Sequence, residues 1–178
     1  GFNALTSNTT GIQNTAVGTQ ALASNTVGST NTAIGLSSMQ ANIIGEQNTA
    51  VGHMTLAANL SGNTNTAVGA NALAASTTAS GNVAVGAGAG IVVTTGISNL
   101  LLGTLAGDSL TTGNSNIFIG TTAGFDCVTG SDNIYIDHPG FAAESLTTRI
   151  GTDQTDAYMA GVFGATVNVG TGTAVFVD

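Results

Sequence analysis

Apolar and polar positions follow a pattern that returns every 17 residues. An Asn-x-x-x-Gly string recurs with its glycine at a constant spacing, at Gly18, Gly35, Gly52, Gly69, Gly86, Gly103 and Gly120. One further step falls on Asp137, where the string NIYID continues the pattern. A repeat of constant length with one apolar string per unit indicates stacked units rather than a globular core.

Each string predicts one short β-strand, because side chains alternate between two faces with a period of two. One face holds two columns, which are Val17, Ile34, Val51, Val68, Val85, Leu102, Ile119, Ile136, and Thr15, Thr32, Thr49, Thr66, Val83, Leu100, Ile117, Ile134. The other face holds Ala16, Ala33, Ala50, Ala67, Ala84, Leu101, Phe118 and Tyr135. A roll can bury only one face. We predict that the Val17 and Thr15 columns are interior, and that the Ala16/Leu101/Phe118/Tyr135 column is the surface for self-association.

An asparagine stands four residues before each repeat glycine and before Asp137. These residues are Asn14, Asn31, Asn48, Asn65, Asn82, Asn99, Asn116 and Asn133. Stacked side-chain amides form hydrogen-bonded ladders along repeated strands. We therefore predict one amide column along a rod of roughly 38 Å, at about 4.8 Å per coil.

The 17-residue period fails after residue 137, so the sequence predicts two parts. Residues 1–137 form an eight-repeat β-solenoid, and residues 138–178 form a C-terminal β cap or transition module. This second part contains the only proline of the chain, Pro139, and its only arginine, Arg149, and the chain has no lysine.

Composition excludes several classes of function. Charged residues make up 6% of the chain and the net charge is −8, with one arginine and no lysine. Nucleic-acid binding depends on basic residues that neutralise phosphates, so we exclude it. No window approaches the ~20 consecutive apolar residues of a membrane helix, so we expect no membrane insertion. The chain begins at Gly1 without a signal-peptide pattern, and we interpret it as part of a longer polypeptide.

The repeat GIQNTAVGTQALASNTVGSTNTAIG resembles two groups of trimeric β-roll fibres. One is the head of trimeric autotransporter adhesins. The other, which is closer, is the repeat region of phage and bacterial tail fibres that precedes an endosialidase-type intramolecular chaperone. The strings at residues 14–28 and 149–167 carry this likeness. The resemblance implies a left-handed β-roll in a parallel homotrimer. It brings no catalytic residue, because the self-cleaving chaperone is not in this sequence.

Few side chains are candidates for chemistry. His53 and His138 share a repeat column but are five coils apart, roughly 24 Å, so within one chain they cannot share a ligand. A threefold axis could gather three copies of one of these histidines around a metal ion, and a solvated or packed histidine is the expected alternative. Cys127 lies in a column with apolar neighbours and is expected to be a buried, inert thiol. Asp126, Asp132, Asp137 and Glu144 are expected to be solvated acids or turn formers rather than a Ca²⁺ site. We predict no catalytic, cofactor-binding or metal-binding residues.

The expected function is a structural shaft or adhesive fibre segment of a tail fibre, an injection apparatus or a cell-surface appendage. Its location would be extracellular or on a virion or appendage surface, with a host-surface receptor or glycan as a possible partner. An adhesin head is one alternative and an ice-binding solenoid is another. Ice binding requires an outward Thr array, and the aliphatic residues that replace Thr15 in later coils point to an interior column. An enzyme is disfavoured because residues 1–107 contain one acid, Glu46, and no Arg or Lys.

Overall fold

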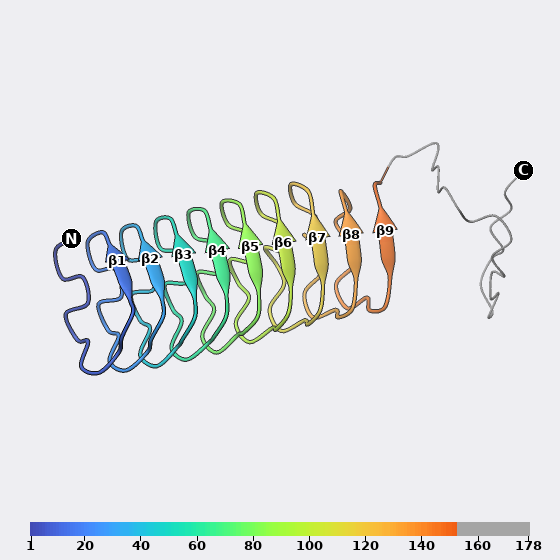
Figure 1. Cartoon of the computed structure of the whole chain (residues 1–178). Coiled ribbons are helices and arrows are strands. Elements are labelled where there is room, and N and C mark those ends of the chain that lie inside the picture. Colours follow the sequence, from blue (N-terminus) through green and yellow to red (C-terminus); the bar gives the residue numbers. More distant parts are fainter. Residues whose placement is uncertain (153–178) are drawn as a thin grey trace, which may run out of the picture.

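The computed structural model describes residues 1–152 and shows a single rod of stacked coils (Figure 1). Within this range the chain forms one parallel sheet with the strands in sequence order. The strands are β1 (Thr15–Val17), β2 (Thr32–Ile34), β3 (Thr49–Val51), β4 (Thr66–Val68), β5 (Val83–Val85), β6 (Leu100–Leu102), β7 (Ile117–Ile119), β8 (Ile134–Ile136) and β9 (Thr148–Ile150). The predicted all-β solenoid is confirmed.

The predicted register is also confirmed. From β1 to β8 each strand pairs with the residue 17 positions later, as in Thr15↔Thr32 and Phe118↔Tyr135. The repeat glycines stack directly on one another, and their backbones are so close that a Cβ on Gly35 would collide with the backbone of Gly52 in the next coil. Gly35 also has φ of 136°, which glycine adopts without strain. The 17-residue spacing is therefore the length of one coil.

In the described residues, the rest of each coil consists of turns and bends. In the coil that precedes β2, positive φ angles occur at Gln20 (59°), Leu22 (50°) and Thr30 (59°). The same places carry positive φ in most other described coils. Left-handed residues reverse the chain direction, so they close the coil through corners rather than a further extended segment.

The predicted assignment of the two strand faces is wrong. Residues in the middle of β2 to β8, which are Ala33, Ala50, Ala67, Ala84, Leu101, Phe118 and Tyr135, have no exposed surface within the single chain. The residues on either side of them point outward, as Val17 (55% exposed) and Val85 (39% exposed) show. The thin interior has room for one strand side chain per coil, and the two flanking side chains lie on the opposite face. The column expected to mediate self-association is therefore the core.

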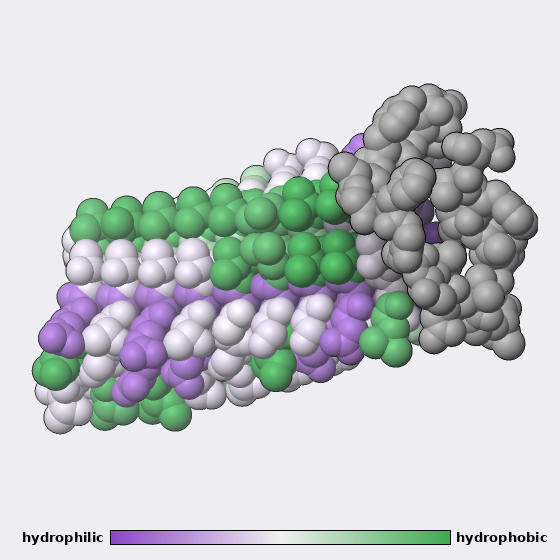
Figure 2. Space-filling model, turned by 45° about the vertical axis from the view of Figure 1, so that its right-hand side comes forward, coloured by the Kyte–Doolittle hydropathy of each residue, from purple (hydrophilic) through white to green (hydrophobic). Residues whose placement is uncertain are grey.

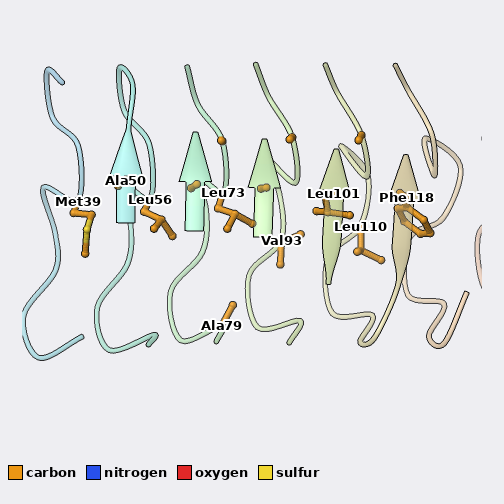
Figure 3. Packing of buried hydrophobic residues seen from close by; sticks show 14 of the residues in the cluster. Met39, Ala50, Leu56, Leu73, Ala79, Val93, Leu101, Leu110 and Phe118 are labelled. Atoms are coloured by element: carbon orange, nitrogen blue, oxygen red, sulfur yellow. The ribbon is translucent and has the colours of Figure 1, made fainter. Parts of the chain in front are cut away.

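Two interior columns exchange volume along the rod (Figure 3). In the early coils a large side chain at the corner, such as Leu56 or Leu73, packs beside an alanine of the strand. In the later coils glycine takes the corner position and the strand residue is large. A Cβ on Gly90 would lie 2.6 Å from Leu101 Cδ1, and a Cβ on Gly124 would collide with the Phe118 ring. Interiors pack to near-crystalline density, so the corner must shrink where the strand residue grows.

The stack continues for one coil beyond residue 137, which differs from the predicted change of module there. Residues 138–151 form a coil three residues shorter than the others, and β9 pairs with β8 at an offset of 14, as in Ile134↔Thr148. The period fails while the strand pairing continues, because residues are lost from the turns. The remainder of the predicted C-terminal module, residues 153–178, lies outside the described part of the chain.

Candidate functional site

The outward face of the sheet is a flat surface made of two side-chain columns. One column runs Val17, Ile34, Val51, Val68, Val85, Leu102, Ile119, Ile136 and Ile150, and the other runs Thr15, Thr32, Thr49, Thr66, Val83, Leu100, Ile117, Ile134 and Thr148. We call this surface the outer sheet face. Figure 2 shows it as two adjacent rows, one green throughout and one that changes from white to green toward the C-terminal end. Parallel pairing keeps the rows straight.

The outer sheet face carries no charge although the whole chain has a net charge of −8. The acids in the described range are Glu46, Asp108, Asp126, Asp132, Asp137 and Glu144, and none of them stands in either column. Arg149 belongs to β9 but occupies the inward column. With about 4.8 Å per coil over nine strands and two columns about 7 Å apart, the face covers roughly 300 Å². An apolar patch of a few hundred Å² is about the largest that a typical monomeric protein exposes, and such patches are often functional.

Two ladders of asparagine amides hold the coils in register from inside. In the predicted ladder, Asn99 Nδ2 donates to Asn82 Oδ1 at 3.0 Å and to the Gly113 carbonyl at 2.9 Å, and the Asn116 amide repeats this on the next coil. All members from Asn31 to Asn133 are buried. The prediction of a structural ladder is confirmed, and these amides have no accessible surface for a glycan.

A second, shorter ladder was not predicted. Asn25 Nδ2 donates to Asn8 Oδ1 at 2.8 Å, and Asn42 and Asn59 continue the chain of bonds at 2.7 Å. It ends at Ser76, and neither Asn59 Oδ1 nor Ser76 Oγ has a hydrogen-bond partner. Val93, Leu110 and Cys127 continue the column as apolar residues. The column of Asn8, Asn25, Asn42 and Asn59 in the sequence is the signal that could have revealed it.

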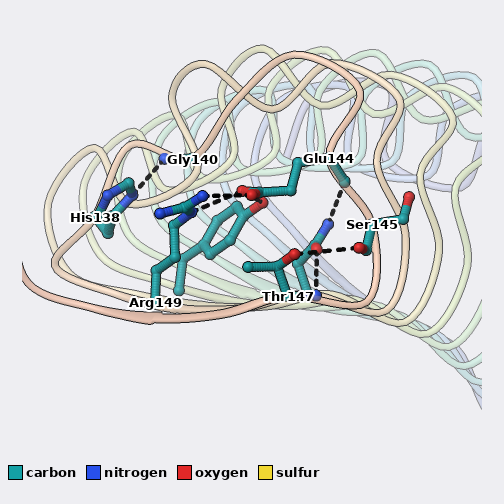
Figure 4. A network of polar contacts seen from close by, with 8 residues as sticks. His138, Gly140, Glu144, Ser145, Thr147 and Arg149 are labelled. Atoms are coloured by element: carbon teal, nitrogen blue, oxygen red, sulfur yellow. Dashed lines mark hydrogen bonds and ion pairs between the residues drawn. The ribbon is translucent and has the colours of Figure 1, made fainter. Parts of the chain in front are cut away.

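A polar cluster stands at the C-terminal end of the described core (Figure 4). Tyr135 donates its hydroxyl to Glu144 Oε2 at 2.7 Å, and Arg149 Nε donates to the same oxygen at 2.8 Å. Arg149 also forms an ion pair with Glu144 and lies 4.7 Å from the centroid of the Phe141 ring. Hydrogen bonds from Arg149 lower the pKa of Glu144 to about 2, whereas burial and the bond to Glu144 raise the pKa of Tyr135. The inward strand column, which is apolar up to β7, therefore ends in Arg149, whose charge is paired with that of Glu144.

The remaining candidates do not form a reactive site in the described residues. Cys127 is buried, as predicted, and burial raises the pKa of its thiol, which disfavours the nucleophilic thiolate. His53 is exposed, and His138 Nδ1 accepts a hydrogen bond from the Gly140 backbone N–H at 2.8 Å. Inertness of Cys127 toward thiol reagents remains a prediction.

The acids expected to be solvated lie apart from one another or in the C-terminal cluster. Asp126, Asp132 and Asp137 are exposed, and Glu144 pairs with Arg149. Between residues 1 and 152, no three His, Cys, Asp or Glu side chains gather in a way that could hold a metal ion. The same stretch contains no helix that is long and apolar enough to cross a membrane.

Comparison with known proteins adds no assignment, since no family model, curated protein or solved structure matches the chain. The class that the fold defines is that of parallel β-solenoid repeat proteins with 17-residue coils. A further assignment has to come from the surface, and the feature of the surface that sets it apart is the outer sheet face.

Proposed function

We propose that this chain is a structural segment of an elongated fibre in which several copies pack side by side through the outer sheet face. The observation that carries the proposal is the exposure of two uncharged, mainly aliphatic columns along β1–β9. Flat apolar sheet faces of this kind mark protein–protein contacts when they remain accessible in an isolated chain. No catalytic role is part of the proposal.

The energetics favour burial of this face between copies. Val17, Ile34, Val68, Val85, Ile119, Ile134 and Ile136 each keep 36% or more of their surface exposed. Burial of apolar surface contributes about 25 cal/mol per Å², so even a stripe of a few hundred Å² contributes several kcal/mol in each contact. Association has costs of similar size, so the contact has to bury most of the exposed aliphatic surface of the face.

The number of copies comes from the resemblance to trimeric β-roll fibres, and we propose three. The exposed outer sheet face supports that association, and it differs from the surface expected from the sequence. A rod whose backbone hydrogen bonds run from coil to coil suits a shaft or the head of an adhesive fibre. We place it on the outside of a virion, an injection apparatus or a cell, in a tail fibre or a related adhesin.

Light scattering coupled to size-exclusion chromatography tests the proposal. The native chain should elute as an oligomer, and three copies would give about three times the chain mass of 17.3 kDa. A matched pair of variants shows whether the outer sheet face is responsible. Val85→Asp should dissociate the oligomer, because a buried unpaired charge is costly. Thr95→Asp, at an exposed bend outside the strands, should leave it intact. A folded monomer from the native chain would contradict the proposal.

Ice binding remains a second candidate, and one observation favours it more than the sequence did. Thr15, Thr32, Thr49 and Thr66 point outward on the flat sheet rather than inward, so they form a regular hydroxyl array on four consecutive coils. The Thr15 column is therefore outward and not interior as the sequence predicted. The array ends at Val83. A thermal-hysteresis measurement separates the two candidates, since a fibre segment should not depress the freezing point beyond its osmotic effect.

A further inference from the structure

The outer sheet face has two unlike halves. Over β1–β4 one of its columns is threonine, at Thr15, Thr32, Thr49 and Thr66. Over β5–β8 the same column is aliphatic, at Val83, Leu100, Ile117 and Ile134. The second column is aliphatic in both halves. The β5–β8 half therefore offers two apolar side chains per coil, and the β1–β4 half offers one.

The partner that fits this face is a second copy of the chain. The columns repeat at the spacing of the coils, about 4.8 Å. A partner whose side chains interdigitate with these columns along the full rod must have the same repeat. A second copy has this repeat, because its coils have the same spacing. The face has no charge that would select an acidic or a basic partner, and its apolar column continues without interruption from β1 to β9.

We propose that contact between copies is carried by the β5–β8 half of the outer sheet face, with the β1–β4 half contributing much less. This inference rests on the proposed function. A threonine keeps its hydroxyl hydrated or must find a partner for it on burial, whereas an aliphatic side chain gains free energy by leaving water.

Exchange of residues between the halves tests the inference without changing the backbone. Leu100→Thr with Ile117→Thr makes β6 and β7 resemble β2 and β3, and Thr32→Val with Thr49→Val does the reverse. Both pairs point outward, and each substitute is found in the same column of this chain, so folding should survive. We expect the first pair to raise the dissociation constant, from sedimentation equilibrium, by about 100-fold. The second pair should leave it unchanged or lower it.

The results separate this inference from the proposed function. A native chain that stays monomeric overturns both. An oligomer that loses less affinity with Leu100→Asp and Ile117→Asp than with Thr32→Asp and Thr49→Asp overturns the inference alone, because the threonine half would then carry the contact. Circular dichroism before each experiment shows that the variant is folded.

Discussion

The N-terminal coils, up to β5, and the C-terminal coils, from β6 to β8, have the same backbone but different interiors. In the first region the strand contributes alanine to the core, the corner contributes leucine or methionine, and a buried asparagine ladder fills the adjacent column. In the second, the strand contributes Leu101, Phe118 or Tyr135, the corner is glycine, and the ladder column is apolar. Phe118 and Tyr135 stack with ring centroids 4.8 Å apart, which matches the distance between coils.

The difference shows that the interior volume of the coils stays similar along the rod, although the residues that fill it change. Corner residues keep a positive φ in both regions, at 50° in Leu73 and 60° in Gly90, so the backbone path does not change with the side chain. What changes is which of two facing positions supplies the volume. The change occurs between β5 and β6, next to the point where the outer sheet face loses its threonines. Coils on the two sides of this point should therefore respond differently to the same substitutions.

The largest loss of stability is expected when a C-terminal coil, whose corner residue is glycine, receives the leucine corner of the N-terminal coils. Gly90→Leu would drive a side chain into Leu101 and Leu73, whose methyl carbons lie 2.6 and 2.9 Å from the added Cβ. Overpacking and a non-glycine residue at positive φ should lower the free energy of unfolding by about 3–5 kcal/mol.

Leu101→Ala alone should cost about 2–5 kcal/mol through the cavity it leaves. The double variant reproduces the Leu73 and Ala84 arrangement, so it should recover much of both losses. Urea denaturation of the four proteins gives the coupling energy. Simple additivity of the two losses would show that the columns do not compensate for each other.

The asparagine ladder that runs through both regions should be equally important in each. Asn65→Ala and Asn99→Ala each remove buried amide bonds to the neighbouring coils and leave a buried carbonyl, of Ala79 or Gly113, without its donor. Each change should lower the free energy of unfolding by about 3 kcal/mol. Thermal or urea denaturation gives the two values. A difference of more than about 1.5 kcal/mol would show that the two regions do not share this framework.

A smaller and opposite effect is expected where the second ladder ends. Ser76 occupies the ladder column, and Ala79 stands where other coils have glycine next to the asparagine amide. A Cβ on the equivalent Gly28 would lie 2.6 Å from Asn25 Oδ1, so Ser76 and Ala79 are mutually compatible while Asn and Ala are not. Ser76→Asn with Ala79→Gly should extend the ladder to Asn59 Oδ1 and raise stability by about 1 kcal/mol.

Ser76→Asn without the second substitution is the matched control. It should destabilise the protein, because the amide and the Ala79 methyl need the same space. Equal stability of the single and double variants, measured by urea denaturation, would remove the steric explanation for Ala79.

The smallest effect is the pH dependence that Glu144 contributes in the C-terminal coil. Arg149, and then Tyr135, lower the pKa of Glu144 from 4.5 to about 2. A carboxyl with a folded pKa below its unfolded value adds stability above pH 4.5, and this stability is lost as the pH falls toward 2. Burial raises the pKa of Asp108, which acts in the opposite sense. The native protein and Glu144→Gln share that contribution, so the difference between their denaturation midpoints isolates Glu144. The difference should shrink as the pH falls from 4.5 to 2, and a constant difference would contradict the assignment.

Much of the fold was predictable because the repeat fixes contacts between coils. Glycine and asparagine at a spacing of 17 predicted the strand register and the ladder through Asn99. The inward face was not predicted, because both strand faces are apolar and alternation alone does not say which one is buried. The ninth coil was missed because it is three residues shorter and replaces the inward tyrosine with Arg149. One signal of the correct face was present: Leu73 gives way to Gly90 in the same step as Ala84 gives way to Leu101. Such an exchange of volume indicates contact.

Protection of the outer sheet face in the native assembly tests the central claim most directly. In a Cys127→Ala background, Val85→Cys places a thiol on this face, and Thr95→Cys places one on an exposed corner of the next coil. The rate of labelling by a bulky thiol reagent is then measured on the folded protein at several concentrations. We predict that Val85→Cys reacts much more slowly than Thr95→Cys and that the difference disappears as dilution dissociates the oligomer. Rapid labelling of both positions at every concentration would show that the face stays in contact with water and that the copies do not pack through it.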